Sequence, residues 1–387
     1  MASILPKETP DMDNVARKKS VAYLGQQHRD IFTRALSNVL STPAAELAFA
    51  EIIDGAPLSQ TPNEVRNGIL PKDHPVRSQH TELCPGVLEK YRDIRTTLDI
   101  QVLQFDFQLL HGYHAASPGS AAFKTRLIEM VAVAIHQIAV YLYRLDLNLG
   151  GHQDYFTWEA PKDDIVFYQN YPDGKLPSLF FHKHYRDYDQ YPDGVADIVG
   201  YWAETRIFGG VVLFDRRKPN QREAHENPDA IFFHSYAENI TYRIWRLLDT
   251  QKKLLLDFLL SGDDVNGVTN SALNPFPILP DRNNLTRIDP EEPIYKTGIY
   301  RDLWERKPLG DRAVDPRMHC CAFNTMGYPS WADFKRSLER ALTRRYEIDD
   351  RREKEIEAEM EEEELAAMSE QQEEDGGEVA RVLKADK

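Results

Sequence analysis

The chain has 387 residues, of which 42% are hydrophobic and 10% are aromatic, and its formal net charge is −15. This composition can build a sizeable core and excludes a chain that is disordered throughout. The charge is unevenly spread: residues 347–378 contain 16 acidic and 3 basic side chains, which leaves a net charge of −2 for the rest of the chain. A body so close to neutral offers no basic surface for nucleic acid.

Cysteine usage and the N-terminal sequence favour an intracellular protein. Cys84, Cys320 and Cys321 are too few for a disulfide framework, as expected in a reducing compartment. Residues 1–10 lack the apolar core of a secretion signal, so a cytoplasmic location is expected. Residues 127–149 are apolar but include charged side chains that are costly in lipid. We interpret them as part of a buried helix and expect no contact with a membrane.

The first 150 residues are predicted to be mainly helical, after a flexible arm at residues 1–20. Apolar side chains recur three and four residues apart, which predicts helices over 21–40, 44–53, 88–110 and 122–147. The last of these is apolar almost all round, as expected of a helix inside a body. Prolines are dense between residues 54 and 86 and predict a long surface excursion.

The apolar pattern changes to a period of two after residue 151. Aromatic and β-branched runs, separated by two Tyr-Pro-Asp-Gly turns, predict an antiparallel β-meander over 155–215. A further helix is expected over 239–260, followed by a proline-rich arm over 262–330. Ser330 and Asp333 then resemble a capping box that opens the last helix.

Together these elements predict an α+β fold. An N-terminal helical layer packs on a central antiparallel β-meander, with a further packed helix, the proline-rich arm and an acidic helical C-terminal tail. Residues 21–346 are expected to form a single domain. Residues 347–387 form the tail, which we expect to be largely solvated or disordered because its apolar stripe ends near Ile348.

The stretch 196–215 carries the first candidate site. If it is a strand, Glu204 and Arg206 lie on the same face, two residues apart. A hydrogen-bonded ion pair inside a covered sheet would have pKa values shifted toward catalysis. Three apolar neighbours would then wall a ligand pocket: Tyr201, Trp202 and Phe208. The alternative is a salt bridge on the solvated face of the sheet.

His182, His184 and Asp187 form the second candidate site. Two histidines two apart on a strand face the same side, and Asp187 follows them, so together they could bind a divalent metal. The spacing departs from both the metallo-β-lactamase and the cupin patterns. The alternative is a pair of half-exposed histidines beside a turn. Apart from a metal at these residues, the sequence predicts no cofactor.

Three other groups are interpreted as structural. His111 and His114 suit a helix end, His136 suits a satisfied core histidine, and the vicinal Cys320 and Cys321 have no motif around them.

Four segments resemble a family of uncharacterised predicted proteins of filamentous fungi: Tyr201–Glu204, Gly209–Arg216, Thr241–Asp249 and Thr297–Arg306. The resemblance covers about residues 88–310. It implies a fungal origin and one folded unit, and it implies no activity because none is established for the family.

The sequence therefore predicts a soluble intracellular binding or interaction protein. This hypothesis depends on the lack of a strong catalytic motif and on the acidic tail, which suits a basic protein partner. The alternative is a small-molecule-modifying enzyme, for example of fungal secondary metabolism. Glu204 would be its acid–base group, positioned by Arg206, with His182 and His184 as a proton-transfer pair or metal site. A purely structural scaffold is a third hypothesis, and whether the protein is an enzyme stays open at this level.

Overall fold

A computed structural model of the chain describes residues 18–60, 70–182, 184–223, 226–235, 240–262, 273–307 and 327–385. The chain divides into two compact units, which are described separately. The first comprises residues up to 307 with 326–329, and the second comprises 308–325 and 330–387. Most of the predicted N-terminal arm, the pair Cys320 and Cys321, and parts of the proline-rich arm lie outside the described residues.

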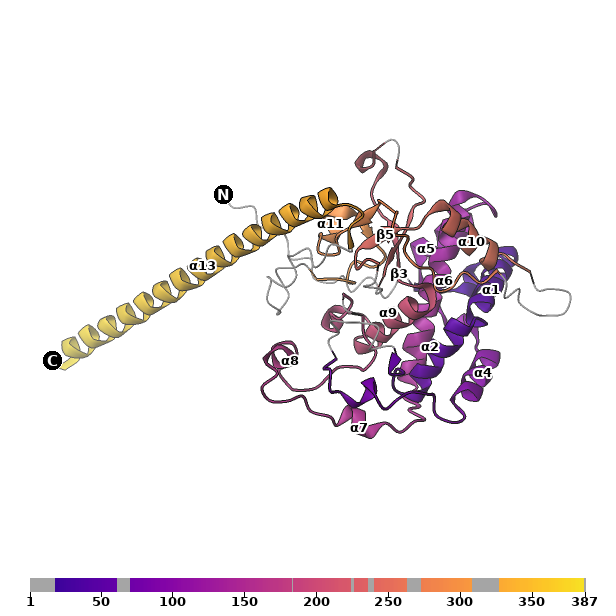
Figure 1. Cartoon of the computed structure of the whole chain (residues 1–387). Helices are drawn as coiled ribbons and strands as arrows, with labels where there is room; N and C mark the ends of the chain where they lie inside the picture. Colours follow the sequence, from indigo (N-terminus) through magenta and orange to yellow (C-terminus); the bar gives the residue numbers. More distant parts are fainter. Residues whose placement is uncertain are drawn as a thin grey trace. The chain divides into compact units, whose positions relative to one another are not determined.

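Helices form one layer of the first unit: α1 (Gln26–Leu40), α2 (Pro43–Asp54), α4 (Val87–Thr97), α5 (Phe107–Ala115), α6 (Ala121–Arg144) and α9 (Val195–Phe208). The side chain of Thr42 caps α2 by accepting the Ala45 N–H, and Pro43 occupies the first helical position. Helices α6 and α9 lie side by side, and α2 packs against both (Figure 1). The predicted helices over 21–40, 44–53 and 122–147 are confirmed to within a few residues.

The predicted single helix over 88–110 is wrong. Helix α4 stops at Thr97, and a short 3₁₀ turn leads into strand β2 (Gln104–Asp106), which pairs antiparallel with β1 (Lys18–Ser20). The side chains of Asp99 and Asp106 accept backbone N–H groups two residues ahead. Such local bonds offer the backbone an alternative to continuing a helix, and the apolar spacing does not reveal them.

Helix α6 is long and apolar enough to cross a membrane by length and composition alone. In this molecule 72% of its most apolar window is buried inside the body, as it is in the core helices of soluble proteins, which pass the same test.

The sheet of the first unit has the order β6-β5-β4-β3-β7, and all neighbours are antiparallel. Its strands are β3 (Val211–Asp215), β4 (Ile231–His234), β5 (Ile244–Arg246), β6 (Arg287–Ile288) and β7 (Ile299–Tyr300). The α+β class and the antiparallel meander are therefore confirmed. The predicted position of the meander is wrong, since all but the first strand follow residue 215.

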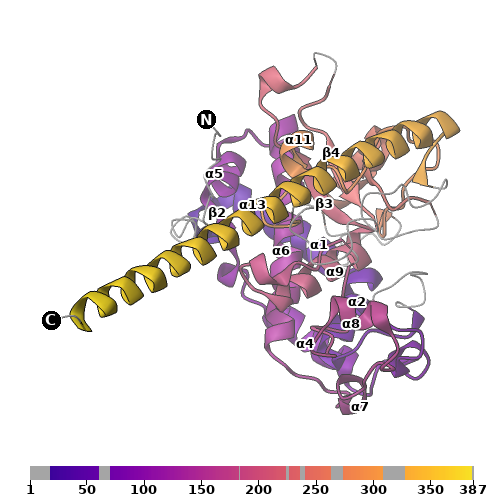
Figure 2. The same cartoon turned by 90° about the vertical axis from the view of Figure 1, so that its left-hand side faces the viewer.

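The stretch 196–208, expected to be a strand, forms helix α9. Nearly every residue of α9 is buried, so the sequence shows neither a 3.6-residue nor a two-residue period to decide between helix and strand. Gly209 ends the helix in the left-handed region, with φ of 97°, and its N–H donates to the Thr205 carbonyl. In both views of the molecule α9 lies between β3 and α2 (Figures 1 and 2).

Residues 153–190 form short helices and loops instead of strands. The helices are α7 (Gln153–Phe156), α8 (Ile165–Asn170) and a 3₁₀ turn at Tyr188–Gln190. Both predicted Tyr-Pro-Asp-Gly turns are confirmed, because the N–H of Gly174 donates to Tyr171 and that of Gly194 to Tyr191.

The expected helix 239–260 is also partly wrong. Ile244–Arg246 form strand β5, and helix α10 occupies only Asp249–Leu259. The expected proline-rich arm contributes β6, the short helix α11 (Ile294–Thr297) and β7. These strands are the two edges of the sheet.

Side chains alternate between the two faces of the sheet, and both faces are covered. Val212, Phe214 and Phe233 join the core shared with α6 and α9. Val211 and Leu213 join a second cluster with Tyr185 and Tyr201. In the second unit, helix α13 (Trp331–Ala385) opens with the predicted cap, since Ser330 Oγ accepts the Asp333 N–H at 3.1 Å.

Candidate functional site

Glu204 lies on α9, and its side chain has no exposed surface. The predicted shared face with Arg206 is wrong, because residues two apart on a helix point about 200° away from each other. Glu204 instead accepts hydrogen bonds from Arg301 Nη1 at 2.6 Å and from His136 Nδ1 at 2.8 Å.

His136 on α6 joins this ion pair to a second carboxylate. Its Nε2 donates to Asp197 Oδ1 at 2.9 Å, so both ring nitrogens face carboxylate oxygens and both carry a proton. Burial opposes this charge, but the hydrogen bonds to Asp197 and Glu204 outweigh it and raise the pKa of His136 to about 9. Neither nitrogen is left to accept a proton, so the network joins α6, α9 and the segment directly after β7 as a structural unit.

Tyr201, Trp202 and Phe208 are buried in the core. Tyr201 packs on Tyr185 in one hydrophobic cluster, while Trp202 and Phe208 belong to the other. The described residues do not bring these three side chains together as walls of one pocket.

His182 and His184 lie in a turn that is held by a single β-bridge between His182 and Tyr185. Their ring centroids are 5.9 Å apart, and the ring of His234 lies 5.3 Å and 4.6 Å from them. Asp187 Oδ2 accepts the Lys307 N–H at 2.9 Å. The predicted strand is wrong here too. Within the described part of the chain, a different set of residues brings its possible metal-binding atoms together.

The set that does converge is Asp54, His80, Cys84 and His152, whose donor atoms all lie within 4.8 Å of one another. We call it the four-donor cluster. Asp54 is the last residue of α2, His80 and Cys84 belong to the loop over 70–86, and His152 immediately precedes α7. Sequence reasoning missed it because three distant segments supply the donors. The local signals, a His-x-x-x-Cys spacing and a histidine after two glycines, are weak alone.

Hydrogen bonds fix the geometry of the four-donor cluster. Asp54 Oδ2 lies 3.1 Å from His80 Nε2 and accepts the Cys84 N–H at 3.0 Å. Asp54 Oδ1 lies 3.3 Å from His152 Nε2, which is 3.9 Å from Cys84 Sγ. The turn that carries His152 is held against the end of α2, where the Gly150 N–H donates to the Asp54 carbonyl at 3.1 Å.

Gly150 is the residue that permits this approach. A Cβ atom there would lie 2.1 Å from His152 Nε2 and 2.4 Å from Asp54 Oδ1. Any larger residue would therefore separate the imidazole from the carboxylate.

The environment keeps the thiol of Cys84 protonated. Burial and the Asp54 carboxylate raise the pKa of Cys84 to about 11. Burial and the neighbouring His80 lower the pKa of His152. A Cys-His-Asp catalytic triad needs the two different nitrogens of its histidine, whereas here Nε2 of His152 faces both partners. The cluster is thus arranged as converging ligands and not as an activated nucleophile.

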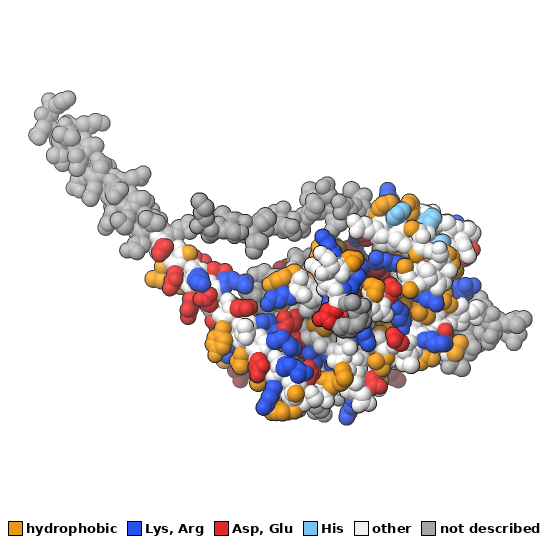
Figure 3. Space-filling model, turned by 90° about the horizontal axis from the view of Figure 1, so that it is seen from above, with side chains coloured by type: hydrophobic (Ala, Val, Ile, Leu, Met, Phe, Trp, Pro, Cys, Tyr) orange, Lys and Arg blue, Asp and Glu red, His pale blue; other side chains and the backbone are white. Residues whose placement is uncertain are grey.

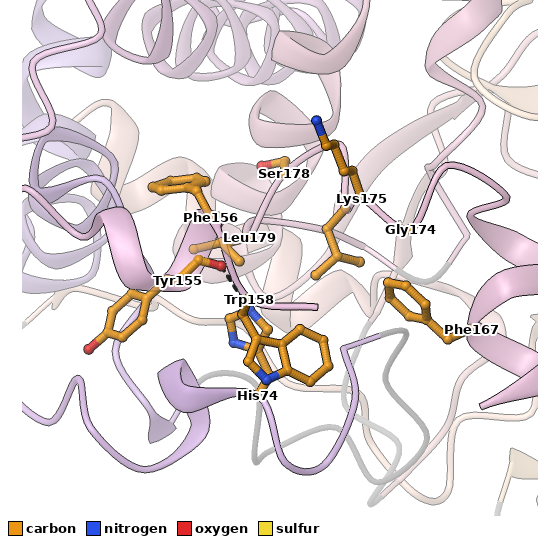
Figure 4. Close-up of a pocket in the computed structure, with 10 residues that line it drawn as sticks. His74, Tyr155, Phe156, Trp158, Phe167, Gly174, Lys175, Ser178 and Leu179 are labelled. Atoms are coloured by element: carbon orange, nitrogen blue, oxygen red, sulfur yellow. Dashed lines mark hydrogen bonds between the residues drawn. The ribbon is translucent and has the colours of Figure 1, made fainter. Parts of the chain in front are cut away.

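A small pocket is lined in part by Tyr155, whose ring stacks on His152 with centroids 4.9 Å apart. Its lining residues border about 320 Å³ of space that includes open solvent, so it is a surface pocket and not an enclosed cavity. Trp158 and Phe167 lie on one side, and the Lys175 side chain extends away from their rings, with its ammonium outermost (Figure 4). His74 packs edge-on against Trp158 and faces the Tyr155 carbonyl, 3.1 Å from its Nε2.

No protein family, curated protein or solved structure matches the chain. The resemblance to fungal proteins stays a prediction.

Proposed function

We propose that the protein binds a small planar molecule with an anionic end in the pocket between Trp158 and Lys175. The observation that carries this proposal is the lining of the pocket, which combines several aromatic side chains with one ammonium group, that of Lys175. Aromatic walls bury a flat apolar body, and a few placed polar groups orient it. An aromatic carboxylate has this pattern. The sequence predicted a binding protein of unspecified ligand, and this proposal names the class of that ligand.

Binding without catalysis fits the neutral, fully hydrogen-bonded state of His74, the histidine in the pocket lining. His74 Nδ1 accepts the Val76 N–H at 3.2 Å, so its Nε2 carries the proton and donates to the Tyr155 carbonyl. Burial lowers the pKa of His74, which favours this neutral form. Both nitrogens are engaged, and proton transfer to a ligand would break one of these bonds.

The alternative function is a small-molecule-modifying enzyme that uses Glu204. It requires a substrate to reach a carboxylate that has no exposed surface and is paired with Arg301 and His136. The geometry supports this alternative less well than a binding pocket. A protein partner for the acidic tail and an intracellular location also stay predictions.

Titration with 1-naphthoate, followed by isothermal titration calorimetry, tests the proposal, with uncharged 1-naphthalenemethanol as the matched probe. We expect saturable binding of naphthoate and weaker binding of the alcohol. Lys175→Met should weaken naphthoate binding about 2- to 5-fold, because an exposed ion pair contributes roughly 0.5–1 kcal/mol. It should leave the binding of the alcohol unchanged.

Lys162→Met is the control, since Lys162 is an exposed lysine of the same loop region outside the pocket lining. Naphthoate that does not bind saturably, or equal effects of the two lysine variants, would overturn the proposed function.

A further inference from the structure

We propose that the four-donor cluster is a zinc site that cross-links three segments of the chain. Asp54 ends α2, His80 and Cys84 belong to the loop over 70–86, and His152 follows the turn after α6. This inference goes beyond the ligand pocket, and neither proposal depends on the other.

The separations of the donor atoms fit a tetrahedral zinc ion. Zinc binds nitrogen and oxygen at about 2.0–2.1 Å and sulfur at about 2.3 Å, which sets tetrahedral donors roughly 3.3–3.6 Å apart. Asp54 and His80 approach to 3.1 Å, Asp54 and His152 to 3.3 Å, and His152 and Cys84 to 3.9 Å. Asp54 meets the two histidines through different oxygens, and all four donors lie within 4.8 Å of one another, so one ion would draw the widest pair inward by up to about 1 Å.

The surroundings of His80 match those of a metal-bound histidine. Its Nδ1 lies 3.0 Å from the Pro57 carbonyl, an acceptor, so this nitrogen carries a proton and Nε2 points into the cluster. Metal-binding histidines almost always donate their second N–H in this way, which fixes the ring and its tautomer. Gly150 adds a second constraint, because only a residue without Cβ leaves room for His152 and Asp54 to converge.

The donor set favours zinc over other divalent cations. Two imidazoles and a thiolate are poor ligands for calcium and magnesium, which prefer oxygen, but are ordinary ligands for zinc. Zinc binding would displace the Cys84 thiol proton to solvent, without oxidation or reduction. Asp54 and Glu51, one helical turn earlier, are both buried, so the site also offers negative charge to a cation.

The number of protein donors indicates a structural role. Catalytic zinc sites keep one position open for water or substrate, whereas structural sites are closed by four protein ligands. Here four side chains are available, and they come from segments up to 98 residues apart. A bound zinc ion would hold the loop over 70–86, which contains little regular structure, against α2 and the turn before α7.

Without metal the same contacts can be read as a buried ion pair between Asp54 and His80, with Cys84 and His152 as neighbours. The two explanations differ in the role that they give to the Cys84 thiol. Only a metal site makes Cys84 a ligand, and cobalt(II) reports a thiolate ligand through a charge-transfer absorption.

The experiment is to strip the purified full chain with a chelator and titrate it with cobalt(II), then with zinc. We expect one metal per chain, a tetrahedral cobalt spectrum with thiolate charge transfer, and its loss when zinc displaces cobalt. Zinc should also raise Tm and protect residues 70–86 from limited proteolysis, and the chelator should reverse both effects.

Variants identify the ligands. Cys84→Ser should remove the charge-transfer absorption, while the double control Cys320→Ser with Cys321→Ser should keep it. His152→Ala should lower the affinity at least about 100-fold, since even indirect supporting residues cost 10- to 100-fold. The exposed His111→Ala control should leave it unchanged.

The wild-type titration decides the question even if a variant does not fold. A wild-type chain that binds no stoichiometric cobalt or zinc, or cobalt without thiolate charge transfer, overturns the zinc site. So does thiolate absorption that persists in Cys84→Ser. None of these three results bears on whether naphthoate binds, so the two proposals fail separately.

Discussion

At the scale of single residues, His136 shows how the hydrogen-bond partners of a buried histidine determine whether it is charged. The sequence indicated that it is a core histidine, but it could not reveal that Asp197 and Glu204 approach it from the same neighbouring helix. Asp197 and Glu204 lie about two turns apart on α9, and each carboxylate meets a different ring nitrogen of His136. The residue therefore stays charged, and its removal leaves two buried carboxylates with fewer partners.

We expect His136→Gln to lower the free energy of unfolding by about 3–5 kcal/mol at pH 6, the usual cost of breaking a buried ion pair. The loss should shrink at high pH. The pKa of His136 is raised from 6.5 to about 9, so its stabilisation is complete below about pH 6.5 and is lost as the pH rises through about 9. Urea unfolding of both proteins at pH 6 and pH 9.5 measures this difference.

The exposed His111→Ala is the control, and its effect should stay within about 0.5 kcal/mol at either pH. If wild type and His136→Gln lose stability equally between pH 6 and pH 9.5, His136 does not carry the charge assigned to it.

At the scale of elements, the sequence predicted helices well where one face is polar and poorly where burial is complete. Helix α1 was predicted because its apolar residues repeat along one side. Helix α9 was not, because it lies between β3 and α2 and is buried on nearly every side, its polar Asp197 and Glu204 included. The Gly209-Gly210 pair was visible in the sequence as an interruption. Only the backbone conformation of Gly209 shows that a helix ends there.

Gly209 therefore offers a test of how α9 is ended. It has φ of 97°, and an added Cβ would lie 2.2 Å from the Ile278 carbonyl oxygen. We expect Gly209→Ala to lower the free energy of unfolding by more than about 3 kcal/mol, because strain in the left-handed region adds to a clash with backbone.

The matched control is Gly119→Ala, where φ is 85° and no atom lies within 4 Å of the added Cβ. Its cost should be only the conformational strain, about 1–2 kcal/mol. Urea denaturation compares the two variants. Equal losses would mean that the contact with Ile278 does not constrain the turn.

At the scale of the whole molecule, the apolar periodicity predicted the fold class and the residue count showed the uneven charge, but neither predicted the candidate site. The four-donor cluster is built from residues that are unremarkable in their own segments and meet only because α2, the loop over 70–86 and the turn after α6 converge. The cluster can therefore be recognised only in the folded structure and not in any one segment of the sequence. On the face of the first unit seen in Figure 3, basic and acidic side chains are interspersed, in contrast to the acidic segment at 347–378.

That acidic segment leads to the last prediction, which concerns helix α13. Glu353, Glu357 and Glu361 are spaced four apart, as are Glu355 and Glu359, so like charges face each other along the exposed helix. Each such pair disfavours helix by roughly 0.2–0.5 kcal/mol at low salt. A favourable pair, Asp350 with Lys354 at 2.7 Å, offsets only part of this repulsion.

We therefore expect the helical far-UV circular dichroism of the full chain to increase when salt is raised from 20 to 500 mM, because screening weakens the repulsion. A lysine-rich peptide at low salt should have the same effect by pairing with the glutamates, as a basic partner would. A chain truncated to residues 1–346 should respond to neither. If the truncated chain changes as much as the full chain, the acidic segment is not the responsive element, and a basic partner for it loses its physical basis.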